Sequence, residues 1–579
     1  MRPNNSGGRW IIVAACSLAF LTFSLTVVRY LNSPLRFDEV EWPIQAEGII
    51  RHGVPKVLYS DDRTLYTHSY YGYDAHYGMW HPPLYLYSLA AAAVFFGTGN
   101  VPMRSVGLIW FALSLCVLWR ILALLPNRPN TVMLRAIPFA LALLTPLIAE
   151  GSLYLDIDNT SLAFGLLLFA FLFLKSPNDD SPKQLLFLTL SFAFSLWSKL
   201  TTPFVMLASL VAYHWLNGNY RRGALQGLVI GGIGSGIFLL TYLLYCKVLG
   251  YPPWFMFEIT YLGKKGLYAS PHALKEILHS LRWHFVWISP PIAIMLLVLT
   301  VNRARAYFVR RQLEKVDFLL IFSLAGLAVY TLWGALWGKY SFPAVLSGVI
   351  ALGHQISSSR YPERIAHTRT FLILVLGLLV VHLIGVPPLQ LRPPGFDLRS
   401  AGLRQAVADS RNVHLLVSVG AFAAFLIVTR YVVLAEKRET GLLLTLLLIY
   451  VLTANPINAM KILLSADDRS PYRPFRDRGF TQTVELLNTT LRRDDVILSP
   501  KDVGFYFRGK HYSTEQTLAF HGVFGLRRLA LSSEVDYVVD SEKYPTIPER
   551  DLLVGTPSIV PLKRIGDFVI YRTHAKSSG

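Results

Sequence analysis

Long apolar runs recur along this chain from Trp10 almost to Asn455, and they restrict what it can fold into. A bilayer-spanning helix needs about 20 mostly apolar residues, and many of the runs approach that length. The composition agrees, because 53% of the residues are hydrophobic and 16% are charged, against about 25% charged in an average globular domain. The sequence therefore predicts an all-α polytopic membrane protein.

The positively charged residues are concentrated in loops, as in other membrane proteins. The formal net charge is +19, and Lys and Arg gather in short loops between the apolar runs. Cytoplasmic loops of membrane proteins carry this excess of positive charge, so we expect membrane lipid and no nucleic acid as a partner. Three cysteines, Cys16, Cys116 and Cys246, all lie inside apolar runs and have neither metal-ligand nor disulfide-framework spacing.

The basic loops favour about thirteen spans, with the N-terminus in the cytoplasm. The first run, residues 10–31, is longer than the apolar core of a signal peptide, and we interpret it as an uncleaved span. Residues 82–97 are short for the hydrocarbon core, which favours a re-entrant or interfacial helix. The predicted spans are 10–31, 105–125, 133–150, 160–175, 184–199, 201–216, 224–247, 284–303, 316–338, 341–356, 370–387, 413–434 and 440–456.

This topology places three loops and the C-terminal tail outside the cytoplasm, at 32–82, 150–159, 250–283 and 457–579. In the tail, "TVELLNTTL" has helical apolar spacing, whereas "DVILS" and "VDYVVDS" are strand-like. The segment "IVPLKRIGDFVIYRT" holds Gly566-Asp567 between two strand-like halves, which predicts a hairpin. We therefore predict a transmembrane domain at 1–456 and a small soluble α/β domain at 457–579.

Carboxylates recur in two of the outer loops. Asp38, Glu39 and Glu41 follow the first span in "LRFDEVEWP", and Asp156 and Asp158 lie in "YLDIDN". Acidic residues also favour helix N-termini, and this structural interpretation fits the first loop taken alone. Two separate carboxylate groups on one face of a membrane protein favour acid–base chemistry.

A histidine and two prolines open the short apolar helix in "WHPPLYLYSL". Proline is preset for a first helical turn, so a helix start explains part of this pattern. His81, outside the cytoplasm and near a helix N-terminus, is also placed to contact a phosphate.

The order of these motifs resembles the C-type (GT-C) glycosyltransferases. The acidic pair after the first span is followed by "HPPLY", then by "TPLIAEGSLYLDID", and then by a lysine after a further span. The pattern is most similar to the branch that contains the protein O-mannosyltransferases and the aminoarabinose transferase that modifies lipid A. About thirteen spans followed by an outer C-terminal domain fit that bacterial transferase.

The resemblance implies roles for particular residues. Asp38 matches the acid that activates the acceptor, Glu39 completes its Asp-Glu pair, and Asp158 matches the second-loop acid. His81 matches a position near the donor phosphate. Further expected substrate-binding residues are Asp156, Lys199, Lys339 and Tyr340, with Lys264 and Lys265 as additional cations from the long outer loop. The chain lacks the domain inserted in eukaryotic O-mannosyltransferases, which puts a protein acceptor in doubt.

The expected reaction moves a sugar from a polyprenyl-phosphate-linked donor to an extracytoplasmic glycan, lipid or protein, with inversion. Asp38 would take the acceptor proton, and cations would neutralise the departing phosphate. We expect no cofactor; the carboxylates of "DID" could bind a divalent metal, but a carboxylate pair alone is weak evidence for a metal site. The alternative is a transporter or flippase of lipid-linked saccharides. Transporters place polar groups near the bilayer midplane, whereas these spans are nearly free of ionisable residues and the charges line one face.

Overall fold

The structure is a computed structural model, and it describes residues 6–56, 64–65, 77–125, 132–258, 277, 280–281, 284, 288–332, 338–358, 451, 477–541 and 559–573. The chain forms two compact units, each described separately below. The first unit comprises Met1–Leu31, Gly107–Thr241 and Lys264–Pro471. The second comprises Asn32–Val106, Tyr242–Gly263 and Tyr472–Gly579.

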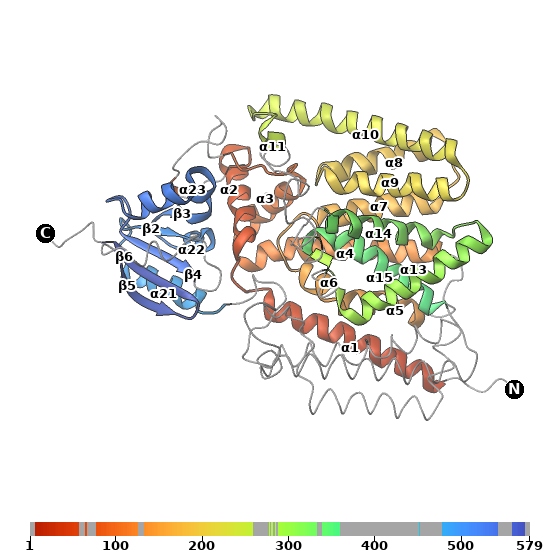
Figure 1. Cartoon of the computed structure of the whole chain (residues 1–579), viewed down its shortest axis with the longest axis horizontal. Coiled ribbons are helices and arrows are strands. Elements are labelled where there is room, and N and C mark those ends of the chain that lie inside the picture. Colours follow the sequence, from red (N-terminus) through yellow and green to blue (C-terminus); the bar gives the residue numbers. More distant parts are fainter. Residues whose placement is uncertain are drawn as a thin grey trace. The chain divides into compact units, whose positions relative to one another are not determined.

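The first unit is built from helices (Figure 1). They are α1 (Ser6–Tyr30), α5 (Val132–Leu144), α6 (Pro146–Gly151), α7 (Ser161–Lys175), α8 (Pro182–Leu196), α9 (Thr201–Leu216), α13 (Pro290–Arg310), α14 (Lys315–Leu332), η5 (Gly338–Ser341) and α15 (Phe342–Ser357), together with most of α4 (Asn100–Leu124) and α10 (Tyr220–Leu249). Such apolar segments form helices because a bilayer leaves backbone N–H and C=O groups no partners except each other.

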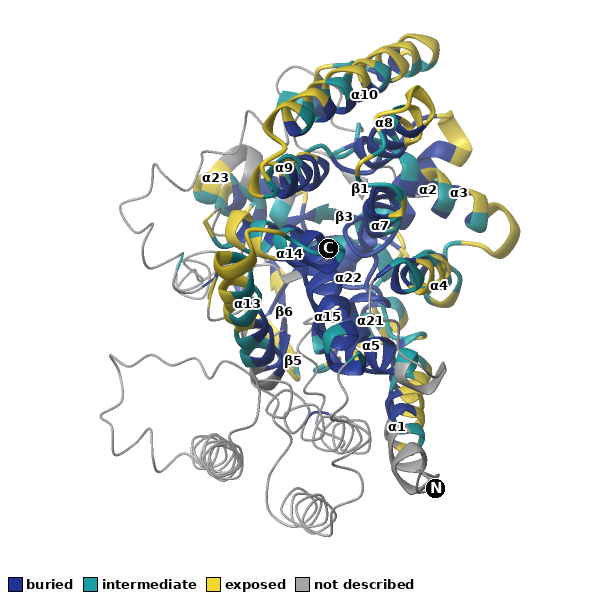
Figure 2. Ribbon diagram, turned by 90° about the vertical axis from the view of Figure 1, so that its right-hand side faces the viewer, coloured by how far each residue is buried: buried dark blue, intermediate teal, exposed yellow. Residues whose placement is uncertain are grey.

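Helix α15 lies at the centre of the first unit and is buried along almost its whole length (Figure 2). It packs against α14 and α5 through small residues. A Cβ added at Gly326 of α14 would lie 2.6 Å from the Cβ of Ala344, and one at Gly353 would lie 2.5 Å from the Cα of Pro138. Glycine at these positions lets the helix backbones approach closely, as is common between membrane helices. By contrast, α10 exposes apolar side chains such as Leu228 and Leu240, as expected of a surface that faces lipid.

Four helices of the described part of the chain are long and apolar enough to cross a bilayer. They are Asn100–Leu124, Tyr220–Leu249, Ile292–Arg310 and Lys315–Leu332. The predicted spans at 160–175 and 201–216 coincide with the shorter helices α7 and α9. The spans predicted at 370–387, 413–434 and 440–456 lie outside the described residues, apart from Val451. The membrane architecture is confirmed, and the number of spans stays a prediction.

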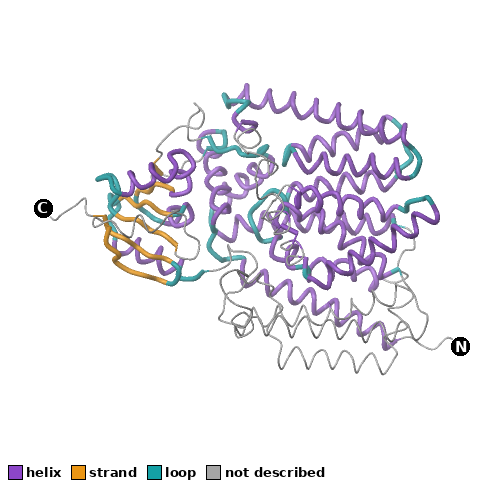
Figure 3. Tube along the Cα trace, in the orientation of Figure 1, coloured by secondary structure: helices purple, strands orange, loops and turns teal. Residues whose placement is uncertain are grey.

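The second unit combines a six-stranded sheet with helices, and the strands stand out in Figure 3. The strands are β1 (Thr64–Leu65), β2 (Val496–Ser499), β3 (Lys510–Ser513), β4 (Tyr537–Ser541), β5 (Ile559–Ile565) and β6 (Phe568–Thr573). The helices are η1 (Phe37–Val40), α2 (Glu41–His52), α3 (Leu84–Phe96), α11 (Phe255–Phe257), α21 (Phe480–Thr490), α22 (Lys501–Tyr506) and α23 (Thr514–Ala530). The helix α3 is the short run that the sequence placed at 82–97.

The strand order is β1-β3-β2-β4-β6-β5, with parallel pairs at the β1 end and antiparallel pairs at the β5 end. The α21 helix, the β2 and β4 strands and the β5–β6 hairpin are all confirmed as predicted from the tail. The sequence did not show that β1, from the first outer loop, pairs with β3, with Thr64 opposite His511. The first outer loop therefore shares a sheet with the tail.

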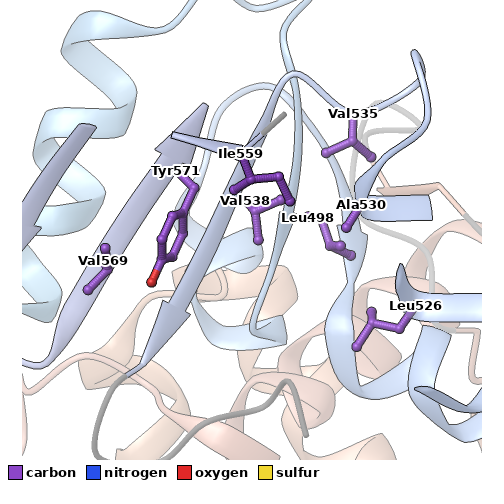
Figure 4. Packing of buried hydrophobic residues seen from close by; sticks show 8 residues of the cluster. All are labelled: Leu498, Leu526, Ala530, Val535, Val538, Ile559, Val569 and Tyr571. Carbon is purple, nitrogen blue, oxygen red and sulfur yellow. The ribbon is translucent and has the colours of Figure 1, made fainter. Parts of the chain in front are cut away.

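Two apolar clusters hold the sheet to its helices. One joins α23 to β2, β4, β5 and β6 through Leu498, Leu526, Ala530, Val535, Val538, Ile559, Val569 and Tyr571 (Figure 4). The other joins α21 and α22 to the sheet through Phe480, Leu487, Ile497, Val503, Phe507, Val539, Phe568 and Ile570. Successive strand residues point to opposite faces, so both faces of the sheet are covered, and Val503 of α22 packs into the second cluster.

Candidate active site

The loop after α6, "YLDIDN", is closed by its own polar side chains. The amide group of Asn159 donates to the backbone oxygens of Gly151 and Tyr154. The Thr160 hydroxyl donates to the backbone oxygen of Asp156 at 2.6 Å, and the Asp158 N–H donates to Oδ1 of Asp156 at 3.3 Å. Asn, Asp and Thr favour such turns because their side chains bond nearby backbone groups. The turns hold both aspartates inside the first unit.

Each of these two aspartates is paired with a lysine from a distant element. Lys199 Nζ lies 2.8 Å from both carboxylate oxygens of Asp158, and Lys339 Nζ lies 2.6 Å from Oδ2 of Asp156. All four residues are buried, and Asp158 is fully inaccessible. We call this group (Asp156, Asp158, Lys199 and Lys339) the Asp–Lys cluster. The two carboxylates and the two ammonium groups of the cluster have a net charge of zero. This pairing is expected, because proteins tolerate buried ions only when they are paired.

Tyrosine rings surround the ammonium groups of the Asp–Lys cluster. Lys199, between α8 and α9, has its Nζ 4.2 Å from the centre of the Tyr340 ring, and Tyr330 stacks on Tyr340 with 5.9 Å between ring centres. Lys339 Nζ lies 5.4 Å from the Tyr154 ring and 5.5 Å from the Tyr340 ring. Cation–π contacts of this kind stabilise buried cations. The structure thus brings together Asp156, Asp158, Lys199, Lys339 and Tyr340, which the sequence assigned from three separate segments.

Burial changes the acidity of Asp158. It raises the pKa of Asp158 to about 6; Lys199 and Lys339 oppose this effect and Asp156 adds to it. A carboxyl group with a pKa near neutrality can hold or release a proton under physiological conditions. Such a group suits general acid–base chemistry better than an ordinary aspartate.

A histidine that the sequence analysis did not single out supports the lysine side of the cluster. The Nε2 of His284 lies 2.6 Å from the hydroxyl oxygen of Ser341, at the end of η5, and its Nδ1 lies 3.2 Å from that of Thr331. The short helix η5 also carries Lys339 and Tyr340. His284 therefore helps to fix η5, although no local motif marks it.

Asp38 lies in the second unit, on η1, with 38% of its side chain exposed. Its Oδ1 is 2.9 Å from Nζ of Lys501, the first residue of α22, and the same Nζ is 2.5 Å from Oε1 of Glu41. Sequence reasoning missed Lys501, because it stands 463 positions after Asp38 in a tail without a recognisable motif.

Glu39 has a different environment from its neighbour. Its carboxylate accepts hydrogen bonds from Arg104 at 2.5 and 3.0 Å, and both side chains are fully buried. Arg104 also donates to the backbone oxygens of Ser33 and Pro34. This ion pair holds the loop that carries Asp38, and a catalytic role for Glu39 stays a prediction.

Three further residues, His81, Lys264 and Lys265, were predicted to bind the donor. His81 is half-buried and precedes Pro82 and Pro83, directly before α3. The neighbouring Met79 N–H donates to the Tyr251 hydroxyl at 3.0 Å. Lys264 and Lys265 lie outside the described residues, as does most of the 250–283 loop. Within the described part, no three His, Cys, Asp or Glu side chains are grouped as a metal site would require.

Part of the chain matches a known family model. Residues 80–245 match the family model described as dolichyl-phosphate-mannose-protein mannosyltransferase. The matched segment contains His81, Asp156, Asp158 and Lys199. Among curated protein sequences, none matches the chain.

The fold extends the likeness to nearly the whole chain. A crystal structure of ArnT from Cupriavidus metallidurans in the apo state superposes with a TM-score of 0.56 at 14% identity, covering 97% of each chain. A second structure of that ArnT, bound to undecaprenyl phosphate, gives the same TM-score at 13% identity and covers 98% of each chain. The protein therefore has the GT-C fold, and the resemblance drawn from the sequence is confirmed.

Proposed function

We propose that this protein is a membrane glycosyltransferase that moves a sugar from a polyprenyl-phosphate-linked donor to an extracytoplasmic acceptor. The observation that carries the proposal is the Asp–Lys cluster, which buries two ammonium groups and an aspartate of raised pKa in an apolar unit of GT-C fold. The family model names a dolichyl-phosphate sugar, and one matching ArnT structure holds undecaprenyl phosphate. Both compounds are polyprenyl phosphates.

The proposed reaction needs a base for the acceptor and positive charge for the leaving phosphate. The acceptor oxygen forms a bond to the anomeric carbon, the bond from that carbon to the donor phosphate breaks, and the acceptor proton passes to Asp38. Direct displacement of this kind inverts the anomeric centre. Negative charge develops on the departing phosphate, and Lys199 and Lys339 would supply the positive charge that stabilises it.

The balanced charge of the cluster bears on how a donor phosphate binds. Each ammonium group now contacts a carboxylate, so an arriving phosphate must share those ammonium groups. Protonation of Asp158, which its raised pKa makes accessible, would offset the added negative charge. The cluster would thus accept an anion without retaining excess negative charge in a buried place.

In the proposed membrane orientation, the N-terminus would be cytoplasmic, and the reaction and the C-terminal α/β part would lie outside the cytoplasm. On that outer side, His81, Lys264 and Lys265 would also contact the donor. The acceptor would be a glycan, a lipid or a protein.

The test uses the purified protein in detergent with radiolabelled polyprenyl-phosphate sugars and a panel of acceptors. We expect transfer in wild type and a loss of about 100-fold or more in Lys199→Met and Lys339→Met, from lost stabilisation of the leaving group. Lys183→Met, an exposed lysine on α8 of the same unit, should retain wild-type transfer. Detergent removes the two compartments, so a transporter would bind the donor and form no product. Binding without product across the whole donor panel would favour the transporter.

A further inference from the structure

Lys501 is surrounded by carboxylates from three elements. Its Nζ contacts Asp38 of η1 and Glu41 of α2, while its backbone N–H donates to Oε2 of Glu515 at 3.0 Å. Although burial lowers the pKa of Lys501, Asp38, Glu41 and Glu515 raise it well above its ordinary value. The side chain is only 17% exposed. Lys501 therefore remains a cation throughout the physiological pH range.

Two residues that follow Lys501 in α22 form hydrogen bonds to the first outer loop. Arg36 Nε donates to Asp502 at 2.6 Å, and both side chains are buried. The Tyr506 hydroxyl accepts the Leu35 N–H at 2.7 Å and donates to Asn100 at 2.6 Å. Charged hydrogen bonds in buried places are strong and directional. The backbone segments that carry Lys501 and Asp38 are consequently held next to each other.

Asp38 shares the ammonium group of Lys501 with a second carboxylate. Asp38 and Glu41 both contact the same ammonium group, whereas Glu39 and Arg104 neutralise each other nearby. Carboxylates that share a site cannot both ionise easily, and an opposite charge within about 4–6 Å favours their ionised forms. Lys501 therefore places one positive charge in contact with both carboxylates.

We propose that Lys501 is a positioning residue for Asp38, through which the C-terminal α/β part keeps that carboxylate ionised and aimed for the acceptor. This inference rests on the proposed function, in which Asp38 takes the acceptor proton. It assigns the tail a part in sugar transfer, since α22 supplies the cation. A merely structural Lys501 would affect unfolding but not the pH dependence of Asp38.

The first experiment is the pH profile of transfer by Lys501→Met in the full chain. We expect the acidic limb to move to higher pH by about one unit, because an opposite charge at contact distance shifts a carboxylate by about 1–3 units. Lys501→Arg should keep the limb near its wild-type position, since it restores the charge. Lys510→Met is the matched control, an exposed lysine on β3 of the same unit, and should leave the profile unchanged.

The second experiment removes the carboxylate of Glu41, which shares the Lys501 ammonium group with Asp38. In the double variant Lys501→Met/Glu41→Gln, the acidic limb should return most of the way to its wild-type pH, because the negative charge of Glu41 beside Asp38 is then removed as well. Glu41→Gln alone should move the limb to lower pH, because the ammonium group is left to Asp38. These opposite shifts keep the inference testable even if Lys501→Met folds poorly. An acidic limb of Glu41→Gln that stays at the wild-type pH, or a limb of the double variant that stays where Lys501→Met puts it, would overturn the inference.

A third readout needs no activity. Diazo reagents esterify protonated carboxyl groups, so the pH dependence of Asp38 esterification, measured by peptide mass spectrometry, reports its protonation. We expect its midpoint to rise in Lys501→Met and to stay unchanged in Lys510→Met. A midpoint equal to wild type in folded Lys501→Met would overturn the inference. Should no donor be used by the wild-type protein, the proposed function fails, while this labelling still decides whether Lys501 controls Asp38.

Discussion

The aspartates of the two units lie in contrasting environments. Asp158 is fully buried beside Lys199, and burial raises its pKa to about 6. Asp38 keeps 38% of its side chain exposed beside Lys501. In the proposed reaction, a buried carboxyl of raised pKa and a half-exposed, ion-paired carboxylate would suit opposite tasks, because the first can hold a proton near neutral pH and the second can accept one.

The first prediction concerns the base. Asp38→Asn preserves the size of the side chain but removes its proton-accepting charge, so transfer should fall by about 10²–10⁴-fold. Donor binding should change little, since Asp38 has the wrong sign to bind a phosphate. Turnover and equilibrium binding of the labelled donor measure the two effects separately. Asp494→Asn, an exposed residue of the same unit, serves as control. Near-full transfer by a folded Asp38→Asn would move the assignment to Glu39 or Asp158.

A second prediction concerns Glu515 and pH. Burial raises the pKa of Glu515 to about 7, and Asp502 adds to the shift while Lys501 opposes it. The folded protein then binds more protons than the unfolded chain between about pH 4.5 and pH 7, so this residue makes stability fall as the pH rises through that window. Glu515→Gln should flatten the fall by a few degrees in melting temperature, measured from pH 5 to pH 8. An unchanged slope would contradict the prediction.

At the scale of elements, helix packing in the first unit depends on small residues. The α14–α15 contact allows no side chain at Gly326, because an added Cβ would lie 2.6 Å from that of Ala344. Gly232 on α10 faces open space. The same substitution should therefore have opposite effects at these two positions.

We predict that Gly326→Ala destabilises the protein by about 1–3 kcal/mol through overpacking. Gly232→Ala should stabilise it by about 0.5–1 kcal/mol, because alanine is the better helix former. Thermal or denaturant unfolding in one detergent, with both variants side by side, gives the comparison. Equal effects of the two variants would show that α14 and α15 do not pack as closely as described.

At the scale of the molecule, the basic loops predict the topology. About thirteen spans place the N-terminus in the cytoplasm and the C-terminus outside. Reporter enzymes that are active on only one side of the membrane, fused after Gly579, should report an outer location. A reporter fused within the tail, beyond residue 541, provides a check on the same side. A cytoplasmic C-terminus would mean that residues 82–97 cross the membrane or that another span is misplaced.

Local patterns in the sequence were sufficient for much of the architecture. Apolar runs predicted helices such as α7 and α9, and Gly566-Asp567 predicted the β5–β6 hairpin. These features depend on residues close together in the chain, because helix and hairpin hydrogen bonds are local. Asp38 and Asp158 were selected in the same way, from carboxylates in short outer loops.

The partners of those carboxylates could not be predicted from local patterns. Lys339 is 183 positions from Asp156, and Lys501 is 463 positions from Asp38. No periodicity links such distant residues, since their contact depends on how helices pack and on how α22 attaches to the first outer loop. Burial is likewise a property of the packed molecule, so the raised pKa of Asp158 and the buried Glu39–Arg104 pair emerge only in three dimensions.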